Sequence, residues 1–216
     1  MSKARDSVFL SVIERIAEVR SETLTMVAID GVEGAGKTRF ADDLAARLEA
    51  DEQIVLRVGI NGFHNSRAIR AARGKDSPEG YYRDSYNLEE LRSRLLFPAR
   101  IGMPFRTAVF DERLDRPISV NPLTIQLPAV LIFDGPFLNR EELRDEWDLS
   151  IFLDVPFDVA FARLARREGG DPNPDAPANR RRLEAQKLYF KESRPQKSAD
   201  MVIDYTDLDY PKIVRL

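Results

Sequence analysis

Apolar residues recur along the chain with two spacings, one typical of amphipathic helices and the other of buried strands. The helical spacing predicts a series of helices in which one face is apolar and the other charged. These helices cover residues 9–19, 40–48, 88–96, 157–167 and 179–191. The third is expected to start after a capping residue, Asn87, and to end before Pro98, since a proline disfavours helical conformation in the residue before it.

Short apolar runs rich in β-branched residues alternate with these helices and predict buried strands. They cover residues 24–29, 54–60, 130–133, 151–155 and 201–205. Two further runs, 105–110 and 117–120, flank a charged hexapeptide and predict a hairpin. Regular alternation of strands and helices predicts an α/β fold, with a parallel sheet covered by helices on both faces.

Two segments follow neither spacing. Residues 61–86 are rich in Gly, Arg, Asp and Tyr, and they predict a long irregular loop at the surface that contacts a substrate. Residues 169–177 are mostly Gly, Pro, Asp and Asn, so a short mobile lid is expected at about 168–178. No low-complexity linker or internal repeat divides the sequence, and a single domain over residues 1–216 is expected.

Composition narrows the classes of function without choosing one. The chain is 43% hydrophobic and 32% charged with a formal net charge of −3, which gives no electrostatic reason to expect a nucleic-acid partner. It contains no cysteine, which excludes disulfides and thiolate metal sites. No apolar run approaches the ~20 residues of a membrane span, and no signal-type segment is present, so a cytoplasmic protein is expected. Membrane attachment by the helix at 9–19 is the less common use of such an apolar stripe.

The strongest local signal is Gly31-Val32-Glu33-Gly34-Ala35-Gly36-Lys37-Thr38, which fits the P-loop pattern. Glycines let the backbone close around phosphates, and the N–H groups at a helix N-terminus favour an anion. Lys37 is expected to reach the outer phosphates, and Thr38 to offer its hydroxyl to Mg²⁺. The expected nucleotide-binding residues are Gly31, Glu33, Gly34, Ala35, Gly36, Lys37, Thr38 and Arg39.

Charged residues farther along the chain complete the expected site. Asp134 ends the strand at 130–133, where a carboxylate commonly lies beside a P-loop and helps hold Mg²⁺; the alternative is a simple turn aspartate. Arg163 and Arg167 share one helical face before the lid and are expected to clamp phosphate oxygens when the lid closes, unless they form a solvated basic face. Three consecutive arginines occupy residues 180–182. Consecutive residues cannot share one helical face, so these arginines are more typical of surface charge than of a phosphate site.

Taken in order, several segments resemble the uridine kinase and phosphoribulokinase-like branch of P-loop kinases. They are Ile29-Asp30-Gly31 with the P-loop, Gly62-Phe63-His64, the segment 77–85, Phe133-Asp134-Gly135-Pro136-Phe137-Leu138 and the segment 199–204. The resemblance spans most of the chain, and only the P-loop is specific by itself. It implies ATP- and Mg²⁺-dependent phosphoryl transfer to a hydroxyl of a small molecule. The implied acceptor is a nucleoside such as uridine or a related ribose-containing or vitamin-like compound, and homo-oligomer formation is left open.

One position departs from the family. The resemblance implies a catalytic aspartate at the end of the second strand, where this sequence has Asn61. An amide has no usable proton affinity near neutral pH and no charge for a metal. Transfer then relies on positioning and electrostatics, which a loose transition state allows, or Asp84 or Asp111 replaces the base. The resemblance also implies that Asp84 contacts substrate hydroxyls.

Two other classes compete with a kinase. A noncatalytic ATP-binding or regulatory protein is favoured by Asn61, and binding without turnover would distinguish it. A GTPase would carry an Asn-Lys-x-Asp segment, and none occurs in residues 134–216, so adenine nucleotides are preferred.

The remaining candidates each have a structural alternative. His64, the sole histidine, is either a loop side chain or a substrate contact. Phe63, Tyr81 and Tyr82 either anchor the loop at 61–86 or stack on a base or sugar. Asp30 is expected to support the P-loop turn.

Overall fold

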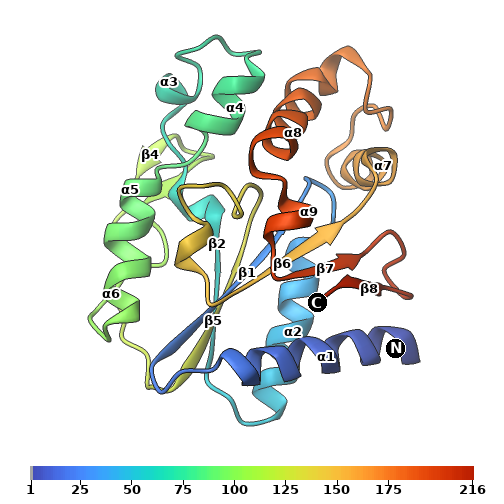
Figure 1. Ribbon diagram of the computed structural model, residues 1–216. Coiled ribbons are helices and arrows are strands. Elements are labelled where there is room, and N and C mark those ends of the chain that lie inside the picture. The colour runs from blue at the N-terminus through green and yellow to red at the C-terminus, as the bar shows by residue number, and fades with distance from the viewer. Residues whose placement is uncertain (1) are drawn as a thin grey trace.

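The computed structural model describes residues 2–216, in which the strands form a six-stranded and a two-stranded sheet (Figure 1). All neighbouring strands of the larger sheet are parallel except the last pair, which is antiparallel. In spatial order its strands are β2 (Val55–Gly59), β5 (Ala129–Asp134), β1 (Leu24–Gly31), β6 (Leu149–Asp154), β7 (Met201–Asp204) and β8 (Lys212–Arg215). The predicted parallel sheet is confirmed, and the antiparallel edge strand β8 was not predicted.

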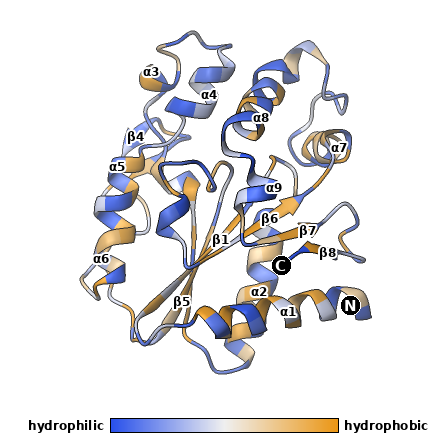
Figure 2. Cartoon of the chain, in the orientation of Figure 1, coloured by the Kyte–Doolittle hydropathy of each residue, from blue (hydrophilic) through white to orange (hydrophobic). Residues whose placement is uncertain are grey.

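Helices cover both faces of this sheet because alternate side chains of its buried central strands point to opposite sides. On β1, Val27 and Ile29 pack in the core that contains α1 (Lys3–Val19) and α2 (Lys37–Ala50). Met26 and Ala28 pack in the second core, beneath the helices around residues 88–100 and 180–193. Figure 2 shows the apolar colour concentrated on the central strands. The predicted α/β fold with helices on both faces is therefore confirmed.

Helix α1 starts before its predicted apolar stripe because Ser2 caps it, accepting a 3.2 Å hydrogen bond from the Arg5 N–H. The stripe of Phe9, Val12 and Ile16 is buried in the core, which favours the packing interpretation over membrane attachment. Within residues 2–216, no helix combines the length and the apolar character needed to cross a membrane.

The segment at 61–86 is more regular than predicted. It contains η1 (Ile60–Phe63), α3 (Arg67–Arg70) and α4 (Pro78–Asp84). Ser77 begins α4 by accepting a 3.0 Å hydrogen bond from the Gly80 N–H, and Pro78 occupies the first turn, where its missing N–H costs nothing. Short helices set by capping carry little apolar periodicity, and for this reason the prediction of a wholly irregular loop is wrong.

The helix after Asn87 does not end before Pro98. It runs through α5 (Leu88–Leu91), the π-helical turn η2 (Arg92–Leu96) and α6 (Phe97–Arg100). Proline has no N–H for the carbonyl of Arg94, four residues earlier, and that carbonyl instead accepts a 2.8 Å hydrogen bond from the Arg106 N–H. A partner distant in sequence thus allows the helix to pass the proline.

Among the other elements, the hairpin is shorter than predicted, and the short helices η3, η4 and α9 were not predicted. These elements are β3 (Phe110–Asp111), β4 (Arg116–Pro117), η3 (Arg144–Glu146), α7 (Phe157–Glu168), η4 (Pro177–Asn179), α8 (Arg180–Ser193) and α9 (Pro195–Ser198). The segment between α7 and η4 is irregular, as expected for the lid; its mobility stays a prediction.

Candidate active site

The glycine-rich loop joins the carboxyl end of β1 to the N-terminus of α2, which is where ligands bind in open α/β sheets. Gly34 and Gly36 have φ angles of 81° and 96°, which L-residues rarely adopt. A Cβ on Gly34 would lie only 2.1 Å from the carbonyl oxygen of Ala160 in α7. The loop therefore needs glycine both for its turn and for the close approach of α7.

Lys37 lies at the start of α2 and is buried by the loop around it. Its ammonium donates 2.9 Å hydrogen bonds to the carbonyl oxygens of Gly31 and Val32. Burial lowers the pKa of Lys37, and the carboxylates of Glu33, Asp30 and Asp134 act against that shift. An ammonium has three donors, and this one is positioned by the backbone on which a phosphate chain would lie.

Asp30 supports the loop from below, as expected from the sequence. Its Oδ1 accepts a 2.7 Å hydrogen bond from the Gly31 N–H. Its Oδ2 accepts from the Asn139 backbone N–H at 3.0 Å, from the Asn139 amide at 2.8 Å, and from the Tyr189 hydroxyl. Burial raises the pKa of Asp30, while these donors stabilise its charged form.

The two expected metal ligands lie together. The Thr38 hydroxyl donates a 2.7 Å hydrogen bond to Oδ2 of Asp134, which ends β5. Arg57 of β2 donates to Oδ1 of Asp134 at 3.0 Å and to the Ile132 carbonyl at 2.9 Å. Arg57 was missed by the sequence interpretation, although a lone arginine inside the apolar run at 54–60 was a signal. Hydroxyl and carboxylate oxygens are ligands that suit Mg²⁺.

A cleft of about 1600 Å³ opens above this pair. Its lining comes from the P-loop, the end of β2, the segment around α3 and α4, and the start of α8. It includes the predicted residues Glu33, Gly34, Gly36, Lys37, Thr38, Arg39, Asn61, Asp134, Arg163 and Arg167. Among the predicted residues, Gly31, Ala35 and Asp84 do not line it.

The structure does not place Asp84 in the lining of the cleft. Its carboxylate accepts a 2.8 Å hydrogen bond from Arg73, and its contact with an acceptor stays a prediction. Asp111 does not line the cleft either, because its carboxylate caps the hairpin turn through the Leu114 N–H at 3.0 Å. Glu112, the next residue, does line it. Neither substitute base named from the sequence lines the cleft, and a role for either as base stays a prediction.

Asn61 lies in η1, exposed at the cleft wall, beside His64. Nδ1 of His64 donates a 3.0 Å hydrogen bond to the Asn61 carbonyl oxygen, which leaves Nε2 as an acceptor in the neutral ring. Burial lowers the pKa of His64, so the neutral form is favoured at pH 7. Nε2 lies 3.9 Å from the Glu112 carboxylate. Packing holds this ring in place, although it also borders the cleft.

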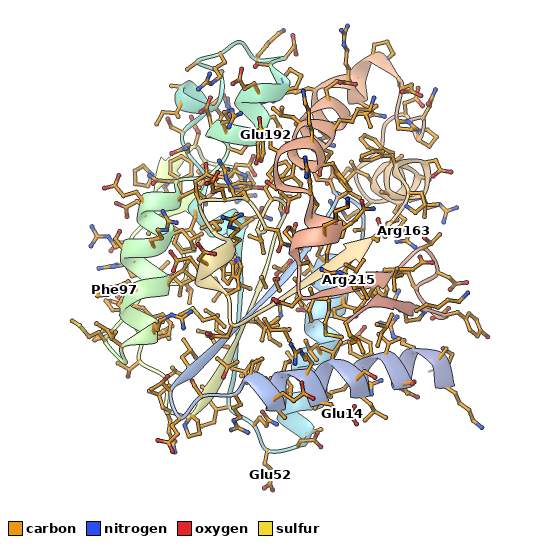
Figure 3. All side chains as sticks on the ribbon, in the orientation of Figure 1. Glu14, Glu52, Phe97, Arg163, Glu192 and Arg215 are labelled. Atoms are coloured by element: carbon orange, nitrogen blue, oxygen red, sulfur yellow. The ribbon has the colours of Figure 1, made fainter. Side chains whose placement is uncertain are left out.

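Arg163 is held differently from the predicted phosphate clamp. Its guanidinium donates to the carbonyl oxygens of Ala35, Tyr205 and Thr206 at 2.7–3.2 Å. Figure 3 shows it below α7, on the side of the β7–β8 turn. This bonding favours a supporting role, in which Arg163 ties the P-loop to the end of β7. Arg167 is 67% exposed beside Glu168, and its role as a clamp stays a prediction.

The start of α8 also differs from the expectation of surface charge. Arg180 is exposed and does not line the cleft, whereas Arg181 and Arg182 do. Arg182 forms ion pairs with Glu33 at 3.2 Å and with Glu168 at 3.3 Å. Only the packing of α8 beside α4 directs these two arginines toward the site.

The parallel sheet, the strand–loop–helix phosphate site and the Thr38–Asp134 pair define a P-loop protein of the kinase type. No protein-family model matches the chain. It is 25% identical over 155 residues to a uridine kinase of Lactobacillus johnsonii, a match that covers 69% of this chain and 70% of the relative. Its sequence thus shows distant homology, at 25% identity, to the uridine kinases of the uridine kinase and phosphoribulokinase-like family.

Solved structures share the fold. A possible uridine kinase from Bacillus stearothermophilus superposes with a TM-score of 0.66 at 22% identity, covering 90% of this chain and 96% of the other. A putative fructose transport system kinase from Silicibacter sp. TM1040 superposes with a TM-score of 0.64 at 25% identity, covering 90% and 94%. The names of these neighbours differ in the compound concerned, so the similarity alone does not identify an acceptor.

Proposed function

We propose that this protein is an ATP-dependent kinase that transfers the γ-phosphoryl group to a hydroxyl of a small molecule. The observation that carries the proposal is a single cleft that is lined both by Lys37, Thr38 and Asp134 and by residues of the segment at 61–86. Its volume of about 1600 Å³ exceeds the roughly 300–1,000 Å³ of typical small-molecule sites, which leaves room for a nucleotide and an acceptor together.

The residues present fit Mg²⁺-ATP. Gly34 and Gly36 allow the positive φ angles of the loop before α2. The N–H groups at a helix N-terminus favour phosphate oxygens, and Lys37 adds a positive charge. Thr38 and Asp134 would hold Mg²⁺, which would neutralise the negative charge that develops on the phosphates during transfer. Arg57 keeps the Asp134 carboxylate oriented from the opposite side.

The proposed chemistry depends on positioning more than on a strong base. Asn61 faces the cleft at the end of β2 and can orient an acceptor hydroxyl through its amide. A loose transition state needs little removal of the hydroxyl proton early in the transfer, so an amide is compatible with slow turnover. A noncatalytic ATP-binding or regulatory protein is the second candidate, favoured by the same residue.

The acceptor class proposed first is a nucleoside such as uridine, or a related ribose-containing or vitamin-like compound. We also propose a cytoplasmic location and no nucleic-acid partner, in keeping with the net charge of −3. A kinase assay with nucleosides, pantothenate and sugar acids as acceptors tests the proposal. We expect ADP release that depends on one acceptor and on Mg²⁺. Tight Mg²⁺-ATP binding without turnover on any acceptor would replace the kinase with the noncatalytic candidate.

A further inference from the structure

Guanidinium groups from two parts of the chain meet on the acceptor side of the cleft. Arg70 ends α3, Arg181 and Arg182 begin α8, and all of them line the cleft. Burial lowers the pKa of Arg181, and the positive charges of Arg70 and Arg182 lower it further, while the carboxylates of Asp76 and Glu33 act against this shift. These side chains therefore lie close enough to repel one another in partly dehydrated surroundings.

The neighbouring carboxylates do not compensate the three side chains equally. Arg70 pairs with Glu112 at 2.7 Å, and Arg182 pairs with Glu33 at 3.2 Å. Among residues 2–216, no hydrogen bond or ion pair joins Arg181 to another side chain; its guanidinium stacks on the Tyr81 ring, 4.9 Å from the centroid. Stacking on an aromatic face leaves the N–H groups at the edge of a guanidinium available to a planar or tetrahedral anion.

A second observation also indicates an anion. The Nε atoms of Arg70 and Arg181 are both buried and have no hydrogen-bond partner in the described part of the chain. Buried donors in folded proteins are nearly always paired, because an unpaired one loses its hydrogen bonds to water without replacement. Carboxylate and phosphate oxygens accept such bonds strongly and neutralise the clustered charge.

We propose that the acceptor carries an anionic group, a carboxylate or a phosphate ester, that binds Arg181 together with Arg70. The inference rests on the proposed function and narrows it: it favours anionic hydroxyl compounds over neutral nucleosides. The position of Arg70 favours the acceptor over the nucleotide as the source of the anion. Arg70 pairs with Glu112, whose carboxylate lies 3.9 Å from His64, the residue bonded to the Asn61 carbonyl. Arg181 stacks on Tyr81, whose hydroxyl donates to Glu33 of the P-loop.

Anion binding can be measured without turnover. The protein is saturated with Mg²⁺ and a non-hydrolysable ATP analogue, so that the P-loop phosphate positions are filled, and inorganic phosphate is then titrated in a calorimeter. We expect Arg181→Gln to weaken phosphate binding at least about tenfold, which corresponds to about 1.4 kcal/mol. Arg181→Lys should lose less, because it keeps the charge but not the planar fork.

The matched control is Arg180→Gln, which removes the same charge one residue earlier, outside this cleft. It should leave phosphate affinity within about twofold of the parent, since the exposed side chain is screened by water. Equal phosphate affinity in all variants, or no phosphate binding by the parent, would overturn the inference. Loss of affinity for the ATP analogue in Arg181→Gln, with phosphate binding unchanged, would overturn it by assigning the arginine to the nucleotide.

Acceptors that differ only in charge separate this inference from the proposed function. Ribose 5-phosphate is compared with ribose, and glycerate with glycerol. The anionic member of a pair should be the better substrate, and Arg181→Gln should reduce kcat/KM for that member alone; the two pairs distinguish phosphate from carboxylate. Turnover of neutral acceptors only would leave the kinase standing and overturn the inference. Phosphate binding through Arg181 in a protein that phosphorylates no acceptor would support the anion site and overturn the proposed kinase function.

Discussion

At the scale of single residues, Lys37 connects loop geometry with phosphate binding. Its ammonium bonds two carbonyl oxygens of the loop and carries the charge that would meet the outer phosphates. We expect Lys37→Ala to weaken Mg²⁺-ATP binding about ten- to hundredfold, since hydrogen bonds to charged groups contribute roughly 1.5–3 kcal/mol. Calorimetry measures the change. Lys187→Ala, an exposed lysine of α8 paired with Glu184, is the control and should bind ATP normally. Equal ATP affinity in all three folded proteins would remove the P-loop assignment.

Asn61 occupies the position where the proposed kinase would place its base, so it is the residue to test first for turnover. Asn61→Asp places a carboxylate at the cleft wall near the Thr38–Asp134 pair, where an acceptor hydroxyl is expected. General-base catalysis contributes roughly 10²–10⁴-fold, so a partial gain of about tenfold should be measurable, mainly in kcat.

Two variants control this prediction. Asp84→Asn should change turnover little, because its carboxylate bonds Arg73 outside the cleft. The assignment of roles is wrong if Asn61→Asp has no effect while Asp84→Asn or Asp111→Asn abolishes turnover.

At the scale of elements, the segment at 169–177 differs from the helices on either side of it. Gly169 and Gly170 have positive φ angles, and the side-chain amide of Asn179, just after the segment, donates to the carbonyls of Asp171 and Asn173 within it. We expect fast amide exchange in the free protein. Exchange should slow about tenfold or more with nucleotide and acceptor bound, as Arg167 engages phosphate.

Hydrogen exchange read out by mass spectrometry tests this. The turn at 51–53 serves as an internal control, since Glu52 lies at the end of the molecule opposite the lid (Figure 3). Unchanged exchange at 169–177 in the saturated ternary complex would show that the segment is not a lid.

At the scale of the whole molecule, Asp30 links three distant parts of the chain through one buried carboxylate. β1 supplies the residue, Asn139 follows β5, and Tyr189 reaches it from α8. Tyr189→Phe removes a hydrogen bond to a charged group and should lower the free energy of unfolding by about 1.5–3 kcal/mol. Tyr82→Phe, which loses a single 3.2 Å contact with the Ser193 hydroxyl, should cost about 0.5–1.5 kcal/mol. Urea unfolding compares them, and an equal or smaller loss for Tyr189→Phe would contradict the linking role.

The sequence by itself determined the features that arise from local spacing. The 3.6-residue and two-residue periods fix which segments are helices and which are buried strands, so the layers of the α/β fold followed from them. The P-loop was also predictable from local sequence, because its glycines and Lys37 lie within one short continuous segment. Asp134 was identifiable because carboxyl ends of parallel strands meet at one edge of a sheet.

Only the tertiary structure decided which side chains from separate elements share the cleft. Pro98 was predicted to end a helix, and it does not. The Arg94 carbonyl, which Pro98 cannot bond, accepts a hydrogen bond from the Arg106 N–H, a partner that local sequence does not reveal. Arg57 hydrogen-bonds Asp134, and Arg181 lines the cleft whereas Asp84 does not. Hydrophobic spacing does not predict any of these side-chain positions. The physical reason is that a polar side chain on a half-exposed face is compatible with either solvent or a site. The choice between the two is made by what packs opposite.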